Sequence, residues 1–461
     1  MGGLLSALNA GKTALGTSQK AVEIAGNNIA NVNTPGYSRQ VAVFNPVPSL
    51  ELNGYFIGQG VNIDSIAREH DVFLTRQIHN KAAVLGEEGG RSAPMAELER
   101  IFSIGDNSVA TEVDRFFDAW AELSTNPAGQ SERQIVVQRG ELLAARFNST
   151  VTDLRQAQVN INASVESMIT AVNPKLQEIA DLNLRISTIE ISGQGANSDR
   201  DRRDMLLEEV SKALGTSYYE EKGMVSVQLP GGMPLVQDTA AMKLEGYYDV
   251  SNNLQLRLNT GTSSIDLPLR NIGGEFKGVM SIRDEFIPDR IVELDHLAYG
   301  IATAVNTQHT AGVKLDGTPA SEFFGPLPLV ESGYAKAMKL NIASGAEVAA
   351  GTGGALGDNT NALGIVKLRD SLTAIDGFDS FTGFYSKIAS KVGIEANRSA
   401  LTLGGTEDAM VQLRNMRDAA VGVSLEEEMV NLMQYQKGFE ASAKYLATVN
   451  ELMDTLLSLK R

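Results

Sequence analysis

Residues that could perform chemistry are few and poorly arranged along this 461-residue chain. Gly11-Lys12-Thr13 has the last three residues of a phosphate-binding loop, but Ser6 stands where the first glycine should be and no strand pattern precedes it. The four histidines, at positions 70, 79, 296 and 309, form neither an HExxH motif nor a pair one helical turn apart beside a carboxylate. No serine has glycine two residues to each side, as a nucleophile elbow requires. We therefore predict no catalytic residue, no cofactor and no metal site.

Composition and charge exclude further classes of protein. The absence of cysteine removes disulfides, thiolate metal sites and cysteine nucleophiles. Lysine and arginine number 40 against 56 aspartate and glutamate, and without a basic stripe this net charge of −16 predicts no nucleic-acid partner. No apolar run approaches the length of a membrane span, so we expect no membrane partner. The first residues, MGGLLSALNAGKTALG, lack the continuous apolar core of a cleaved secretory signal.

The two ends of the chain carry matching patterns. Apolar residues recur at every seventh position near both ends, which predicts two long helices. The repeated residues are Leu8, Leu15, Val22 and Ile29 near one end, and Leu425, Leu432, Phe439, Leu446 and Met453 near the other. Small residues accompany the first stripe, which favours close contact between helices. We predict that the terminal helices pair as a coiled coil and that these nine residues form an assembly interface with neighbouring subunits. The alternative is that each stripe faces the core of its own domain.

The terminal helices should be marginally stable in a single copy. Five buried apolar side chains per helix barely offset the entropy lost by ordering roughly 30 residues. We therefore expect both ends to be mobile in the free chain and to become ordered on assembly. An apolar helix face that is exposed before assembly would also need protection against aggregation.

A turn motif directly follows the first helix. Residues 27–40 read NNIANVNTPGYSRQ, in which asparagine tolerates left-handed backbone. Pro35 and Gly36 suit the two central positions of a type II turn. Together with Asn28 and Tyr37, they should fix where the chain leaves the terminal helix and reverses into an extended segment.

The interior divides by the period of its hydrophobic residues. Helical spacing predicts a long-helix rod domain from residues 41–215, 275–311 and 362–421. Alternation in residues 216–274 predicts an antiparallel β-module. Residues 312–361 form an insertion rich in glycine and proline, which we associate with the β-module and to which we assign two strands, at 327–330 and 338–342. The fold class is thus mainly α with an inserted, outer antiparallel β-domain, and residues 1–40 and 422–461 form the terminal coiled-coil domain.

Local signals give finer expectations for the helices. Helix starts are predicted at Asp71, Thr111, Ser131 and Ser424 from capping residues. The helix that follows Ser131 should be long. Pro174 should kink or divide it, because proline lacks a donor and clashes with the preceding turn.

Both ends resemble a known family. Residues 27–40 and the C-terminal SLEEEMVNLMQYQKGFEASAKYLATVNELMDTLL resemble the ends of the bacterial flagellar rod, hook and hook-associated axial proteins. Interior segments resemble the hook–filament junction members of this family. These segments are REHDVFL at 68–74, DRFFDAW at 114–120, RDMLL at 203–207 and GEFKG at 274–278.

The resemblance implies a structural protein without enzymatic activity that self-assembles as a ring or helical segment between hook and filament. The implied partners are further copies of itself, hook protein, the second hook–filament junction protein and a flagellar export chaperone. The implied location is extracellular, reached through the flagellar type III channel without a cleaved signal, although the missing secretory signal alone would suggest the cytoplasm. Alternatives within the family are the second junction protein, hook protein or a distal rod protein. Outside it, a coiled-coil binding protein or adhesin remains an alternative.

Overall fold

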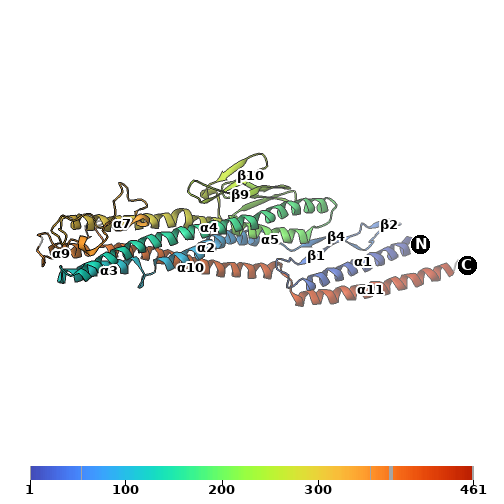
Figure 1. The fold of residues 1–461 in the computed structure, drawn as a ribbon. Helices are drawn as coiled ribbons and strands as arrows, with labels where there is room; N and C mark the ends of the chain where they lie inside the picture. The colour runs from blue at the N-terminus through green and yellow to red at the C-terminus, as the bar shows by residue number, and fades with distance from the viewer. Residues whose placement is uncertain (1, 53, 354, 373–376, 459–461) are drawn as a thin grey trace.

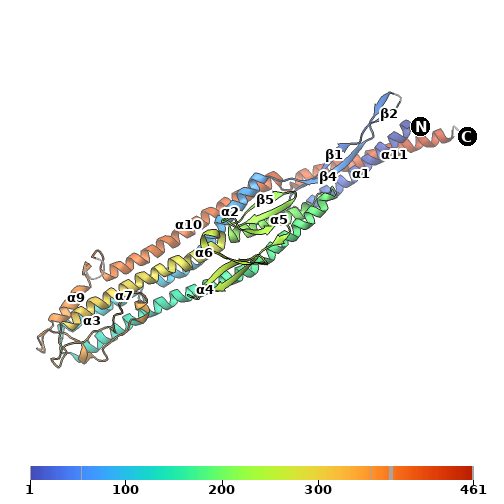
Figure 2. The same cartoon turned by 90° about the horizontal axis from the view of Figure 1, so that it is seen from above.

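The chain forms a long rod of helices that narrows into a thinner extension carrying both termini (Figure 1). The computed structural model describes residues 2–52, 54–353, 355–372 and 377–458. A β-module lies along one flank of the rod, in the half nearer to the terminal helices (Figure 2). Among the described residues, no helix combines the length and the apolar character needed to cross a membrane.

The terminal helices pack side by side. Helix α1 (Gly2–Ala30) and helix α11 (Leu425–Ser458) run antiparallel, so both chain ends lie at the same tip (Figures 1 and 2). The predicted pairing is therefore confirmed. Small residues permit the close approach, since a Cβ added at Gly11 would lie only 2.8 Å from the Cδ2 atom of Leu446. At the start of α11, the Ser424 hydroxyl accepts a hydrogen bond from the Glu427 amide at 3.4 Å, as expected of a capping residue.

A β-ribbon returns along α1 after the turn. Strands β1 (Gln40–Pro46) and β4 (Val61–Arg68) pair antiparallel, and β2 (Leu50–Leu52) and β3 (Tyr55–Ile57) extend the ribbon as a hairpin. The Thr13 hydroxyl of α1 donates to the Gln59 carbonyl at 3.4 Å, which fixes the ribbon beside the terminal helix. We grouped these residues with the rod from sequence, whereas the structure places them against α1.

Within the part of the chain that the structure describes, eight helices build the rod. They are α2 (Val72–Phe102), α3 (Val109–Thr125), α4 (Gln130–Ile191), α5 (Asn197–Leu214), α6 (Gly274–Ser281), α7 (Ile287–Thr310), α9 (Thr360–Leu368) and α10 (Phe381–Val421). A π-helical segment, Ile282–Phe286, joins α6 to α7. The helices share one continuous core of fully buried apolar side chains.

Helix boundaries partly follow the predicted capping residues. Asp71 caps α2 by accepting hydrogen bonds from the Phe73 and Leu74 amides, as predicted. Helix α3 instead begins at Val109 with Ser108 as its cap, and α4 begins after Gly129. Thr111 and Ser131 therefore lie inside helices, and both predicted starts were wrong by a few residues.

Helix α4 continues through Pro174 as one element of 62 residues, so the predicted division was wrong. The helix continues through the proline because residues on both sides of it, Val172 and Leu176, are buried in the core. Next to it, Asn173 holds the backbone of Leu244 through two hydrogen bonds of 2.8 Å. Tertiary contacts here outweigh the cost of one missing helical hydrogen bond.

Two antiparallel sheets form the β-module, which confirms the predicted architecture. The first contains β5 (Ser217–Glu221), β6 (Met224–Gln228), β7 (Pro234–Gln237) and β8 (Ala240–Ala241). The second contains β9 (Lys243–Tyr248), β10 (Leu254–Asn259) and β11 (Ser264–Leu267), with β10 in the centre.

Three asparagines of α4 attach both sheets to the rod. Asn162, Asn173 and Asn183 stand about three helical turns apart, so they lie on one face of the helix. Each side chain donates to a strand or turn carbonyl and accepts from a strand amide. Asn183, for example, binds the carbonyl and amide of Val225 at 2.8 and 3.0 Å, and it also donates to the Asp238 carbonyl at 2.6 Å. The sheets are thus hydrogen-bonded to the helix that carries them.

The insertion at 312–361 packs against the helices at the end of the rod remote from the termini, rather than with the β-module as we predicted (Figure 1). Its elements are the short helices α8 (Tyr334–Ala337) and η3 (Gly345–Glu347). The predicted strands were wrong: residues 327–330 have no strand, and 338–342 contribute one isolated bridge, from Leu340 to Phe324. Phe323 and Phe324 instead fill the aromatic core around Phe116 and Trp120.

Candidate functional site at the terminal helices

The nine residues of the predicted interface are only partly buried by the packing of α1 against α11. Leu8, Leu15, Val22, Ile29, Leu432, Leu446 and Met453 are half-buried. Leu425 and Phe439 are 48% and 38% exposed. The fully buried positions of the helix pair belong mainly to small or polar residues, among them Gly11, Thr17, Ala21, Ala25 and Asn28. The larger apolar side chains therefore keep part of their surface available.

The buried row of α11 lies three residues after the heptad stripe and not four. Positions four residues after the heptad stripe, such as Met429 and Leu457, are exposed. Positions three residues after it, Glu428 and Val449, are buried against α1. As a result, α11 presents apolar side chains on an outer flank that no described part of the chain covers.

Asn28 of the turn motif forms the centre of a hydrogen-bonded cluster. Its amide nitrogen donates to the Gln40 carbonyl at 2.9 Å and to the Glu428 carboxylate at 3.1 Å. Its side-chain oxygen accepts from the Tyr37 hydroxyl at 2.9 Å and from the Gln40 amide at 3.0 Å. A single buried side chain thereby connects the end of α1, the turn, the first residue of β1 and the first turn of α11.

Buried charge completes this cluster. Glu428 is almost fully buried, and its carboxylate accepts from Arg39 Nε at 2.8 Å. Arg39 also forms an ion pair with Glu427 at 3.2 Å, and its backbone amide donates to the Val421 carbonyl at the end of α10. A buried carboxylate is tolerated only when paired and hydrogen-bonded, as Glu428 is here. The sequence analysis missed Arg39 and Glu428 as partners, although both lie within the two segments that carry the family resemblance.

The turn itself has the geometry that Pro35 and Gly36 suggest. Gly36 has φ of +79°, and the Tyr37 amide donates to the Thr34 carbonyl at 3.2 Å. A Cβ atom at position 36 would also collide with the side chain of Met205 on α5. Glycine is therefore required both by backbone conformation and by contact with the rod.

Charged groups join the turn to the rod. The Ser38 amide donates to Asp201 of α5 at 3.0 Å, and Arg68 pairs with both Asp201 and Asp204 at 2.7 Å. Burial raises the pKa of Tyr37 to about 12, with the nearby Asp201 and Glu428 carboxylates adding to the shift. The turn is thus held between the terminal helices on one side and α5 on the other.

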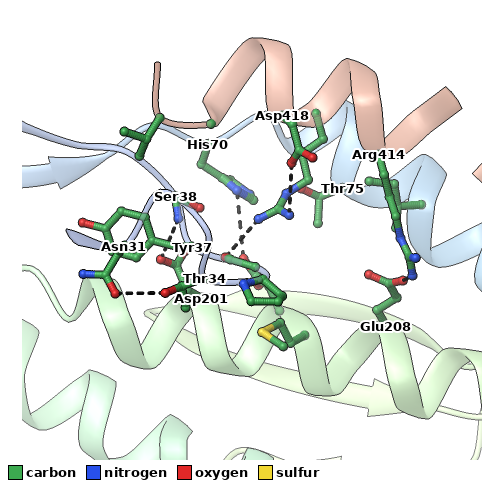
Figure 3. A pocket seen from close by; sticks show the side chains of 18 of the residues that line it. Asn31, Thr34, Tyr37, Ser38, His70, Thr75, Asp201, Glu208, Arg414 and Asp418 are labelled. Atoms are coloured by element: carbon green, nitrogen blue, oxygen red, sulfur yellow. Dashed lines mark hydrogen bonds and ion pairs between the residues drawn. The ribbon is translucent and has the colours of Figure 1, made fainter. Parts of the chain in front are cut away.

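A cavity of about 530 Å³ lies at this joint (Figure 3). The turn, α5 and the last turns of α10 line it, and charges pair along its wall: Arg414 contacts Glu208 at 2.6 Å, and Arg417 donates to the Gly36 carbonyl at 3.0 Å. Burial and the neighbouring Arg68 lower the pKa of His70. Among the described residues, no group of three or more histidines and carboxylates could hold a metal ion. The cavity marks the joint between the rod and the terminal helices.

Comparison with protein families agrees with this two-part organisation. The model for the flagellar basal body rod protein matches residues 8–37, and that for the C-terminal region of the flagellar basal body rod FlgEFG proteins matches residues 419–459. The model for the helical domain of the flagellar hook-associated protein FlgK matches residues 95–324. The chain thus combines a pair of terminal helices of the rod-protein type with a helical rod domain, and this combination defines its class as the flagellar axial proteins.

Similar proteins narrow this class. Flagellar hook-associated protein 1 of Bacillus subtilis is 26% identical over 499 aligned positions, covering 98% of this chain and 97% of that protein. Its namesake from Escherichia coli is 23% identical, covering 99% of this chain and 100% of that protein. The chain belongs to the flagellar hook-associated protein 1 family. The solved structure of the flagellar hook junction protein FlgK from Burkholderia pseudomallei has the same fold, with a TM-score of 0.67 at 15% identity, covering 76% of this chain and 100% of that one.

Proposed function

We propose that this protein is a structural subunit of the hook–filament junction that assembles with copies of itself through its terminal helices. In this role it has no enzymatic activity. The observation that carries the proposal is the exposed apolar flank of α11, on a helix pair whose own interior is built from small and polar residues. Contiguous apolar surface of this kind marks a site of contact with another protein.

The partners of this surface follow from the family. Hook protein on one side and the second junction protein on the other would contact the assembled subunits. A flagellar export chaperone would cover α11 before secretion through the type III channel without a cleaved signal, and the final location would be the extracellular flagellum. The nine heptad residues, from Leu8 to Met453, would face neighbouring subunits in the assembly.

Replacing Leu432 and Phe439 by aspartate tests the proposal. Two added carboxylates on this flank should abolish filament attachment, motility and capture by the chaperone, because charge cannot be buried there without a partner. The matched control is Gln434→Asp with Gln436→Asp, which adds the same charge at exposed polar positions of the same helix.

Immunogold labelling of the unaltered protein completes the experiment. We expect label at the boundary between hook and filament, whereas label along the hook or at the distal rod would assign the chain to another position on the flagellar axis. Unchanged motility and filament attachment in the Leu432→Asp/Phe439→Asp variant would contradict the assembly role.

A further inference from the structure

The strand pair at the outer end of the ribbon is a projection that no other described part of the chain covers. We call it the finger and define it as strands β2 (Leu50–Leu52) and β3 (Tyr55–Ile57). Tyr55 and Phe56 are 76% and 75% exposed, and Leu50 and Ile57 are exposed as well. Successive strand residues point to opposite faces, so Leu50, Tyr55 and Ile57 lie on one face, and Phe56 lies on the other face beside its strand partner Glu51. Two exposed aromatic side chains on a two-stranded hairpin lack any packing role within the described chain.

A second exposed apolar patch lies on α11, near the joint with the rod. Leu425, Met429 and Met433 follow one another at intervals of four residues, so they form one ridge on the helix surface, and all three are exposed. We call this the methionine ridge. Methionine side chains adapt to irregular partners and make favourable sulfur contacts with aromatic rings. The methionine ridge therefore offers an apolar surface with sulfur atoms, against which the aromatic rings of Tyr55 and Phe56 can pack.

The finger and the methionine ridge of one copy lie too far apart to meet. The ribbon contacts α1 through Gln59 and Thr13, and the neighbouring Gly11 faces Leu446 of α11. Along α11, the methionine ridge lies more than ten residues before Leu446, toward the joint with the rod. The finger extends from the same level in the opposite direction, toward the chain ends (Figure 2). Helical and strand rises put their separation at roughly 30 Å along the axis.

Two complementary patches that cannot meet within a copy can meet between copies. We propose that the finger of one subunit docks on the methionine ridge of a second copy displaced along the long axis. Such a contact joins two different surfaces, so it is heterologous and repeats from subunit to subunit, as a ring or a helical segment requires. This inference rests on the proposed function and adds to it the surfaces that would be in contact.

The charges around the patches agree with this pairing. Glu51 is the one charged residue between positions 41 and 60, and it is exposed. Lys437 follows Met433 by one helical turn and is also exposed, and it forms a solvent-exposed ion pair with Glu440 at 2.9 Å that is weak enough to exchange partners. Opposite charges beside two apolar patches favour one register over others more than they add affinity. The ridge is also continuous with Leu432 of the predicted assembly stripe, so one flank of α11 would serve both contacts.

Disulfide trapping tests the contact directly, because the chain has no cysteine of its own. Bacteria would make two differently tagged full-length variants, Phe56→Cys and Met433→Cys, in place of the native protein. After mild oxidation of isolated flagella, we expect a dimer that carries both tags. Disulfides need Cα atoms within about 7 Å, so this dimer should exceed that from Phe56→Cys with Ile394→Cys by about tenfold. Ile394 is at least as exposed as Met433, with 69% against 54% of its surface accessible, but it lies on α10 of the rod.

A second variant tests the docking of the finger through its effect on filament attachment. Tyr55→Ser with Phe56→Ser should leave the thermal unfolding of the free chain unchanged, because both side chains are exposed. The same variant should weaken filament attachment. Tagged protein present in flagella without the Phe56–Met433 dimer would overturn the docking inference and leave the proposed function standing. Absence of the unaltered protein from flagella would overturn both.

Discussion

The rod and the terminal helices are both built from long helices, yet they bury different side chains. In the rod, Phe116, Trp120 and Phe323 are fully buried and their rings contact one another. In the terminal pair, the buried positions include Ala21, Ala25 and the polar Asn28, while the large apolar residues are half-buried or exposed. The rod therefore has a large apolar core of its own, whereas the terminal pair leaves large apolar side chains partly or wholly exposed.

This difference separates stability from assembly. Large side chains that are buried within one copy stabilise that copy. Side chains left on the outer flank of α11 contribute little to the stability of the free chain, and in the assembly that we propose they would be buried between subunits. The hydrogen-bonded cluster around Asn28 then has a positional role, since it fixes where the terminal pair begins relative to the rod.

The largest expected effect is in the rod core. Phe116→Ala should lower the free energy of unfolding by about 3–5 kcal/mol, because it removes a buried ring and leaves a cavity. Urea unfolding followed by fluorescence of Trp120, the one tryptophan of the chain, measures this change. The matched variant Phe439→Ala, in the terminal pair, should cost less than about 1 kcal/mol in the free chain. Equal losses of unfolding free energy in the two variants would contradict the claim that the rod core is more important for stability than the terminal pair.

Acid should weaken the rod through His309. This side chain is buried beside Trp120, and its Nδ1 and Nε2 atoms bond the Ser321 carbonyl at 2.7 Å and the Ala349 amide at 3.0 Å. Nε2 must be unprotonated to accept from an amide, and burial lowers the pKa of His309 to about 4. The unfolded chain, with an ordinary histidine pKa near 6.5, then binds more protons between these two values.

Stability from this group is therefore complete above pH 6.5 and falls as the pH is lowered toward 4, by up to about 3 kcal/mol. Unfolding in urea at a series of pH values, again followed by Trp120, measures the slope. His309→Asn should flatten the pH dependence over this interval. An identical slope in that variant would show that other groups cause it.

A smaller and more local effect is expected at the joint. Asn28→Ala leaves the Tyr37 hydroxyl and the buried Glu428 carboxylate each short of one partner, at a cost of about 1–3 kcal/mol. The loss should appear as faster amide exchange in α1 and α11, while unfolding of the rod reported by Trp120 stays unchanged. A lowered rod stability in this variant would mean that the joint and the rod core unfold as one unit.

Periodicity was sufficient to predict the terminal helices, the long helix α4 and the alternating strands of the β-module. It failed where partners are distant in sequence. Nothing near Pro174 indicates that Asn173 is held by Leu244, and the apolar run at 327–330 has the composition of a strand but no neighbouring strand to pair with. The division into domains at the residues we chose stays a prediction.

At the candidate functional site, too, the sequence predicted local features but not contacts between distant residues. The turn could be predicted from Pro35 and Gly36 because its geometry is local. The buried pairing of Arg39 and Glu428 joins residues nearly four hundred positions apart, so no local pattern reveals it. Heptad spacing located the assembly stripe but not its exposure, because two adjacent rows of a helix can both be apolar while only one faces the partner helix.

Hydrogen–deuterium exchange on the full chain, free and in isolated flagella, tests the central claim most directly. We expect amides of α1 and α11 to exchange rapidly in the free chain and to become protected in the flagellum, while amides of the rod helices are protected in both states. Strong protection of both terminal helices in the free chain would contradict the account, because the pair would then be complete without its neighbours.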